Sequence, residues 1–254
     1  PVGTIWTDIW GTTWSKIQDE VMGMPVGCPL QDIHALKHFK WPDPDDERIC
    51  TKIYKMAQEF PGGDLLLGGS HRDTLWEKAY MLGGMEAMMI NFLTEPEFVR
   101  EVLHHIMDFQ LGIAAHYLKL GVKVAFLGDD LGSQIGPLLS PRLMRQYLLP
   151  EYQRLCSLYK DNGVLIRFHS CGHVEAALDL FLELGVDFLN PVQATANNLG
   201  AVRERTQGRM TLYGGISSNL LMQGPPDRID AEVHRLIWML GQKGGYICAP
   251  DQDM

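Results

Sequence analysis

The stretch that decides the fold runs from Val164 to Gln193 and reads VLIRFHSCGHVEAALDLFLELGVDFLNPVQ. It begins with Val164 to Phe168, an apolar run of strand length, and continues with apolar residues at helical spacing from Val174 to Leu184. Gly185, a residue that favours the end of a helix, follows, and Val186 to Leu189 forms a second strand-like run. The stretch therefore predicts a strand, a helix and a second strand in succession.

The same alternation continues over most of the chain. After an irregular part, residues 1–60, strand-like runs alternate with helical patterns through residues 61–254 without an internal repeat or a linker. The expected strands are 64–67, 122–127, 164–168, 186–189, 209–213 and 246–250. Regular β/α winding of this kind gives a parallel sheet, either open and doubly wound or closed into a barrel. We predict a single α/β domain over residues 1–254, a (β/α)8 TIM barrel; because the chain opens at Pro1 and closes just after its last strand, we expect terminal elements to be missing.

Composition excludes several classes of protein. Of 254 residues, 46% are hydrophobic, enough for a large core, and the net charge of −9 without a basic run argues against a nucleic acid-binding surface. No apolar stretch reaches the roughly 18 uncharged residues of a membrane span, and no signal peptide is recognisable. The five cysteines show no small-domain disulfide spacing: Cys28, Cys50, Cys156, Cys171 and Cys248. We therefore expect free or metal-bound thiols in a reducing compartment, the cytoplasm.

The sequence His169-Ser170-Cys171 directly follows a predicted strand. Loops after strand C-termini carry the active site of alternating β/α proteins, and residues i and i+2 of an extended chain project to the same side. Cys248 ends the last predicted strand, so a barrel would bring it to the same rim. One imidazole and two thiolates leave the fourth tetrahedral position of zinc open, which is typical of a catalytic site. The alternative is that Cys248 is a small buried apolar residue and His169 a loop histidine with satisfied hydrogen bonds.

Other polar side chains follow predicted strands and are candidates for substrate binding. His71 lies in a glycine-rich loop, where it either contacts a ligand or caps the next helix. Asp129 and Asp130 are adjacent, so that one can face a pocket while the other caps or hydrogen-bonds the loop. Asn190 and Gln193 follow a later strand and bind either a ligand or the loop backbone.

Several motifs taken together resemble the uroporphyrinogen decarboxylase superfamily, and within it the corrinoid-dependent methyltransferases. The motifs are F-H-S-C-G-H-V, N-P-V-Q, G-D-D-L-G-S-Q, L-S-P, Y-G-G-I and G-G-Y-I-C-A, and the similarity extends from about Trp6 to Met254. The resemblance implies an (α/β)8 barrel in which His169, Cys171 and Cys248 are the zinc ligands and catalytic residues. We expect the N-terminal strand region of the superfamily, with the arginine-rich motif of the decarboxylases, to lie before Pro1 and outside this sequence.

The resemblance also implies an activity. A thiol bound to zinc is deprotonated at neutral pH, and the thiolate can accept a methyl group from a corrinoid held by a partner protein; for a methoxylated donor, zinc would polarise the ether oxygen. Asp129, Gln193 and His71 are the candidates for orienting the small substrate. Two alternatives stay open: a metal-free decarboxylase of a tetrapyrrole carboxylate, disfavoured by the scarcity of arginines, and a non-catalytic tetrapyrrole-binding barrel. The protein can form an oligomer under each of these three functional hypotheses.

Overall fold

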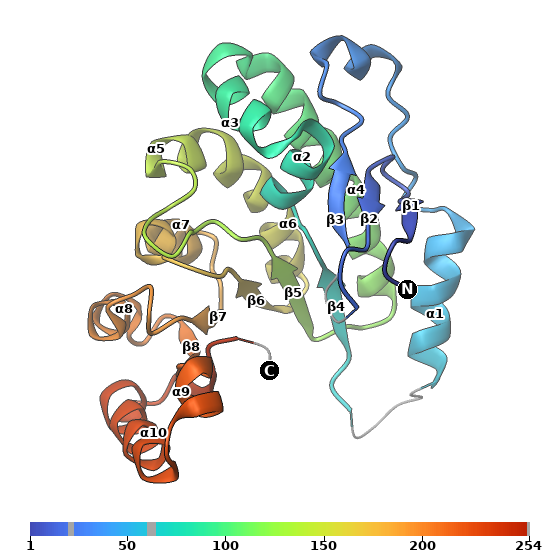
Figure 1. Ribbon diagram of the computed structural model, residues 1–254. Helices are drawn as coiled ribbons and strands as arrows, with labels where there is room; N and C mark the ends of the chain where they lie inside the picture. Colours follow the sequence, from blue (N-terminus) through green and yellow to red (C-terminus); the bar gives the residue numbers. More distant parts are fainter. Residues whose placement is uncertain (20–22, 60–64, 253–254) are drawn as a thin grey trace.

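The computed structural model describes residues 1–19, 23–59 and 65–252 (Figure 1). Two sheets organise this part of the chain: a three-stranded antiparallel sheet near the N-terminus and a six-stranded sheet that carries the rest. The strands of the larger sheet are β4 (Gly68–His71), β5 (Val124–Gly128), β6 (Leu165–His169), β7 (Phe188–Val192), β8 (Thr211–Ile216) and β9 (Tyr246–Pro250).

The six strands lie in sequence order and are all parallel. A doubly wound sheet reverses its strand order at a switch point, whereas a barrel adds each strand to the same side of the last. The order found here is that of a TIM barrel, and it excludes the open doubly wound alternative. Among the described residues β4 and β9 are not paired with each other, so these strands form a curved section of barrel wall.

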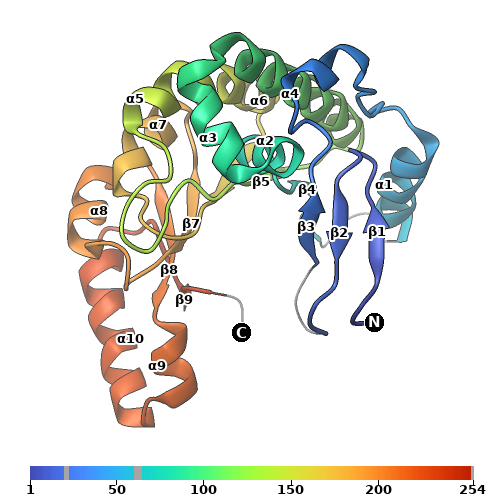
Figure 2. The ribbon, with the colours of Figure 1, turned by 45° about the horizontal axis from the view of Figure 1, so that its top comes forward.

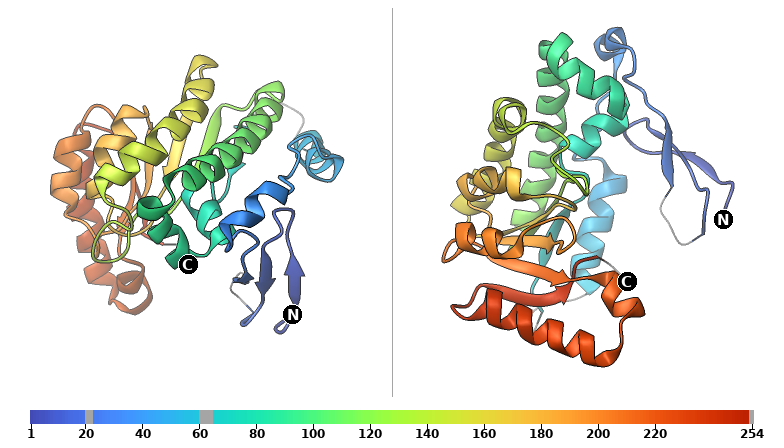
Figure 3. Two further views of the ribbon diagram at one scale, coloured as in Figure 1. Left: turned by 90° about the horizontal axis from the view of Figure 1, so that it is seen from above. Right: turned by 60° about the vertical axis from the view of Figure 1, so that its left-hand side comes forward.

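Helices follow the strands and lie on the outer side of the curved sheet (Figures 2 and 3). The α-helices are α1 (Glu47–Glu59), α2 (Trp76–Gly83), α3 (Met85–Thr94), α4 (Pro96–Lys119), α5 (Pro141–Leu143), α6 (Leu149–Asp161), α7 (Leu178–Glu183), α8 (Leu199–Thr206), α9 (Ser218–Gln223) and α10 (Pro226–Gly241). Shorter segments are 3-10 helical (Ile33–His38, Glu175–Ala177) or π-helical (Met144–Leu148). In the part of the chain that is described, no helix is both long and apolar enough to cross a membrane.

The alternation of side chains along β6 separates the core from the barrel interior. Phe168 is fully buried, and its ring centroid lies 4.7 Å from that of Phe181 on α7 and 5.4 Å from that of Tyr152 on α6. Truncating a buried phenylalanine of this kind to alanine costs about 3–5 kcal/mol. Arg167 and His169 alternate with Phe168 and therefore point to the opposite side, into the barrel. The apolar packing of β6 thus fixes which side chains reach the interior.

The strand expected at 64–67 is wrong in position. Asp64 lies outside the described residues, Leu65 to Leu67 form no strand, and β4 begins at Gly68. Glycines at this place allow close packing: a Cβ at Gly68 would lie 2.3 Å from the Phe126 ring, and one at Gly69 would lie 2.6 Å from the Tyr117 ring. The first strand of the parallel sheet therefore lies where glycines let the aromatic rings pack closely, and not at the preceding apolar run.

The N-terminal part is more regular than expected. It forms the antiparallel strands β1 (Ile5–Thr7), β2 (Thr13–Ser15) and β3 (Met24–Gly27), which stand to one side of the parallel sheet (Figure 3). The buried Trp10 joins this sheet to the barrel, because its ring centroid lies 4.7 Å from that of Phe109 on α4.

Candidate functional site

The C-terminal ends of β5 and β6 bring three possible metal ligands together: Asp130, His169 and Cys171. The Cys171 Sγ lies 3.4 Å from His169 Nε2, which lies 3.8 Å from Asp130 Oδ1. All three ligand atoms are within 4.8 Å of one another. One nitrogen, one sulfur and one oxygen therefore converge on a single point at the mouth of the barrel.

Backbone contacts hold the loop that carries Cys171. The Cys171 N–H donates to Asp130 Oδ1 over 2.7 Å, and the Leu131 N–H donates to Ser170 Oγ over 3.0 Å. Gly172 has a φ of 78°, and a Cβ there would lie 2.6 Å from the Gly132 carbonyl oxygen, so only glycine fits. The positions of the thiol and of the carboxylate are thus fixed relative to each other.

Asn190 orients the imidazole of His169. The Asn190 Oδ1 lies 3.1 Å from His169 Nδ1 and also accepts a hydrogen bond from Arg167 Nη2 over 2.5 Å. An amide oxygen only accepts, so His169 Nδ1 carries the proton and Nε2 presents its lone pair to the thiol and the carboxylate. This is the tautomer that a metal-binding histidine needs.

The environment of Cys171 disfavours its anion when no cation is present. Burial, followed by the charge of Asp130, raises the pKa of the thiol to about 12. A metal ion reverses this effect, because a coordinated thiol is deprotonated. The cluster therefore has the composition and shape of a cation site but lacks a positive charge of its own.

A cavity of about 420 Å³ opens beside the cluster. Its lining includes Arg72, Glu77, Asp130, Arg167 and His169. Burial and then the charges of Asp129 and Asp130 raise the pKa of Glu77 to about 8. The cavity thus offers two guanidinium groups and a carboxyl group of raised pKa next to the candidate ligands.

Arg167 is a further residue of the site, outside the set of site residues that the sequence predicts. Its guanidinium lies between the rings of Phe126 and Tyr213, 5.2 Å and 4.8 Å from their centroids. Its Nε is buried and has no hydrogen-bond partner among the described residues. The spacing of two residues from His169 was a usable signal, because it places both side chains on the same face of β6.

Cys248 does not join His169 and Cys171, which corrects the expected ligand set. The register pairs Tyr213 with Ile247 and Gly214 with Cys248. Since Tyr213 lines the barrel interior, Ile247 shares its face and Cys248 points to the other side. From this end of the chain it is Gln252 that approaches the centre, with its Nε2 3.5 Å from the Cys171 Sγ.

Asp129 is buried and caps a helix, which corrects its expected role in substrate binding. It is 0% exposed, and its carboxylate accepts the N–H groups at the start of α2, those of Leu75, Trp76 and Glu77, over 3.0, 2.6 and 2.6 Å. The Tyr152 hydroxyl donates to the same carboxylate. Asp129 therefore satisfies the free amides of α2, while its neighbour Asp130 faces the cavity.

His71 and Gln193 also make structural contacts: His71 belongs to the cavity lining, but its ring nitrogens and the Gln193 amide oxygen are hydrogen-bonded within the protein. His71 ends β4, and its buried ring lies 2.8 Å from Gln110 Oε1 and 2.5 Å from the Tyr159 hydroxyl. The Gln193 Oε1 accepts the Gly172 N–H and the Gln134 side-chain amide. Gln193 thus supports the loop of Cys171, and His71 links β4 to α4 and α6.

The burial of His71 predicts a loss of stability in acid. Burial lowers its pKa to about 4, whereas the unfolded chain has a histidine pKa of about 6.5. Between these values the unfolded state binds the additional proton, so the free energy of unfolding decreases as the pH falls, by about 2 kcal/mol at about pH 5 from this residue alone. Urea denaturation at several pH values measures the slope. The His71→Gln variant should be less stable but show a flatter slope between about pH 5 and 6.5; equal slopes would contradict the prediction.

Comparison with known proteins identifies the fold family. The model of the family described as uroporphyrinogen decarboxylase (URO-D) matches residues 23–254. A methyltransferase from Methanosarcina mazei has a similar fold, with a TM-score of 0.75, 20% identity and coverage of 97% of this chain and 71% of that chain. A D-tagatose 3-epimerase-like protein is matched at a TM-score of 0.37 and 12% identity over 82% of this chain and 77% of its own. A search of curated proteins found no match.

Proposed function

This chain belongs to the uroporphyrinogen decarboxylase (URO-D) family, and from that premise we propose that it is a zinc-dependent methyltransferase. It moves a methyl group between a corrinoid carried by a partner protein and a small thiol or methylated substrate. The observation that carries the proposal is the convergence of Asp130, His169 and Cys171 beside an open cavity. The similarity of fold to the Methanosarcina mazei methyltransferase supports it.

The three residues fit zinc by their chemistry. Thiolate, imidazole and carboxylate are all common zinc ligands, and three protein ligands leave a position open for substrate. Bound zinc would lower the pKa of a substrate thiol or polarise an ether oxygen. The ligand set differs from the expected one, since Asp130 takes the place that the sequence suggested for Cys248.

The other residues of the cavity bind and orient. Arg167, held by Asn190 and by two aromatic rings, and Arg72 can bind an anionic group of a small substrate. Glu77, whose pKa is raised by burial and by nearby carboxylates, can donate a hydrogen bond to a substrate oxygen when it is protonated. Arg72 and Arg167 are the arginines of the described cavity lining, too few for a tetrapyrrole with many carboxylates. This composition favours a small substrate over the decarboxylase alternative.

The proposal is tested with the purified chain, by elemental analysis and by an assay with methylcobalamin and 2-mercaptoethanol. The expected result is bound zinc, together with thiol-dependent demethylation that a chelator abolishes and added zinc restores. Absorbance of the methyl–cobalt bond follows the reaction. A native protein without zinc that decarboxylates a tetrapyrrole would establish the alternative instead.

Asn190→Ala should weaken zinc binding at this centre by about 10–100-fold, because residues that orient a metal-binding histidine have effects of this size. Competition with a chromogenic chelator measures the affinity. Asn198→Ala is the matched control: the Asn198 side chain accepts the Ala201 N–H and caps α8. Equal affinities in the two variants would show that Asn190 has no part in orienting the imidazole.

A further inference from the structure

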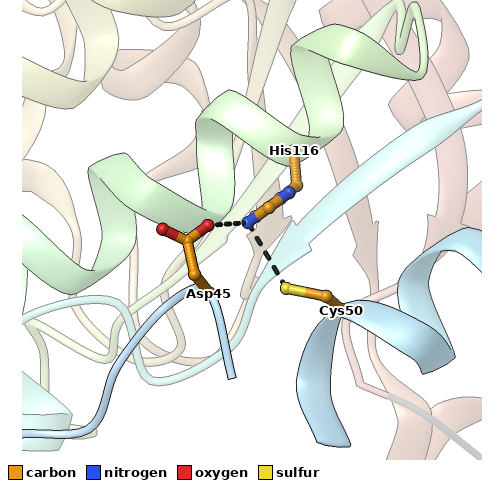
Figure 4. Close-up of side chains that lie close together, drawn as sticks. All are labelled: Asp45, Cys50 and His116. Carbon is orange, nitrogen blue, oxygen red and sulfur yellow. Dashed lines mark hydrogen bonds and ion pairs between the residues drawn. The ribbon is translucent and has the colours of Figure 1, made fainter. Parts of the chain in front are cut away.

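A second cluster of potential ligands lies between α1 and α4, away from the barrel mouth (Figure 4). His116, near the end of α4, points its Nε2 at Asp45, 2.9 Å away, and at the Sγ of Cys50 on α1, 3.4 Å away. The three ligand atoms lie within 4.8 Å of one another. The cluster has the same three ligand types as the barrel-mouth centre but shares no residue with the cavity there.

The imidazole of His116 is buried and held from both sides. Its Nδ1 lies 3.1 Å from the hydroxyl of Tyr54, which belongs to α1. When this hydroxyl accepts the Nδ1 proton, Nε2 presents a lone pair to Asp45 and Cys50. The Cys50 thiol donates to the Pro44 carbonyl over 3.2 Å, so a carboxylate oxygen, a sulfur and a ring nitrogen can all direct lone pairs to one point, an arrangement that suits a cation. Without a cation, Nε2 must carry a proton and donate it to Asp45.

The turn before α1 is shaped to bring Asp45 to this point. A Cβ at Gly112 would lie 2.4 Å from Pro44, so glycine lets the turn rest directly on α4 one helical turn before His116. The neighbours of Asp45 are engaged elsewhere: Asp43 accepts the Asp45 N–H, and Asp46 accepts the Arg48 N–H. The carboxylate of Asp45 is thus left for His116.

Helix α1 has little else to hold it. None of its residues is buried, and among them Ile49 and Ile53 are the ones that pack, partly exposed, against the core. A helix of 13 residues needs tertiary contacts to be stable in water. A divalent cation bound by Asp45, Cys50 and His116 would supply a contact between this helix and α4.

We propose that Asp45, Cys50 and His116 form a second zinc site, which fastens α1 to α4. Nitrogen, sulfur and oxygen ligands at this separation suit zinc. The site is structural, because it joins two helices and its three residues do not line the cavity at the barrel mouth. The proposal stands independently of the activity proposed for the barrel mouth.

The test is the zinc stoichiometry of the full chain, measured by equilibrium dialysis of chelator-treated protein against micromolar zinc. The wild type should bind about two equivalents, Cys50→Ala and Cys171→Ala about one each, and the double variant none, since each cysteine is a ligand at one site. Cys28→Ala is the matched control, because Cys28 is half-buried and belongs to neither cluster, and it should bind as the wild type does.

Wild-type stoichiometry in Cys50→Ala overturns the proposal, and so does a wild-type protein whose only zinc is lost in Cys171→Ala. Failure of the barrel-mouth centre gives a different pattern, in which Cys50→Ala alone removes zinc. If Cys50→Ala does not fold, Asp45→Asn replaces it, because the side chain of Asp45 is largely exposed. Zinc should also raise the Tm of Cys171→Ala but not that of the double variant.

Discussion

Cys171→Ala should lose zinc from the barrel mouth and transfer methyl groups at least about 1000-fold more slowly, whereas Cys248→Ser should keep both properties. The first effect is large because a metal ion stabilises the reacting charge by several kcal/mol, and each 1.36 kcal/mol is worth about tenfold in rate. Zinc content and the rate of methylcobalamin demethylation are the measurements. Unaltered circular dichroism and Tm of Cys171→Ala would show that the fold is intact.

Cys248 is an informative control, because the sequence alone predicts it to be a zinc ligand in the same way as Cys171. Both are cysteines at strand ends, but Cys171 lies against His169 Nε2, whereas Cys248 is exposed and lies on the other side of β9. Loss of zinc in Cys248→Ser would mean that β9 is shifted by one residue from the register found here. Loss of activity without loss of zinc would point to a role of Cys248 outside the metal centre.

The difference between these two cysteines shows what the sequence could predict. The proximity of His169 and Cys171 depends only on a spacing of two along one extended segment, which is a local property. The position of Cys248 depends on the register of β9 against β8, and a shift of one residue turns every side chain to the opposite face. Periodicity located β9 at residues 246–250 but could not fix its register.

Other differences between the predictions from the sequence and the structure also arise from contacts between distant parts of the chain. A Gly-Gly pair does not read as a strand, so the sequence predicts β4 too early in the chain and places His71 in a loop rather than at the end of a strand. Arg167 could have been found from its spacing to His169, but Glu77 could not. Glu77 lies in the first turn of α2, and it reaches the cavity only because Asp129 fixes the start of that helix. Long-range packing, absent from any local pattern, created these features.

Alanine substitutions of the neighbouring residues Asp129 and Asp130 should affect different properties: the first should reduce stability, and the second should reduce zinc binding. Asp129→Ala leaves the amides of Leu75, Trp76 and Glu77 and the hydroxyl of Tyr152 without their acceptor. Hydrogen bonds to a charged group contribute about 1.5–3 kcal/mol each, not additively, so the free energy of unfolding should fall by about 3–5 kcal/mol. Urea denaturation measures this change.

Asp130→Ala should have the complementary effect: a change in stability of about 1 kcal/mol or less and a marked loss of zinc at the barrel mouth. The side chain of Asp130 is 37% exposed, and it accepts one amide, that of Cys171, so little of the fold depends on it. Urea denaturation and zinc titration are measured for both variants. Together they distinguish the residue that stabilises the fold from the residue that binds zinc. If Asp130→Ala unfolds readily while Asp129→Ala remains stable and loses its metal, the carboxylates have exchanged places, and the ligand set proposed for the centre must change with them.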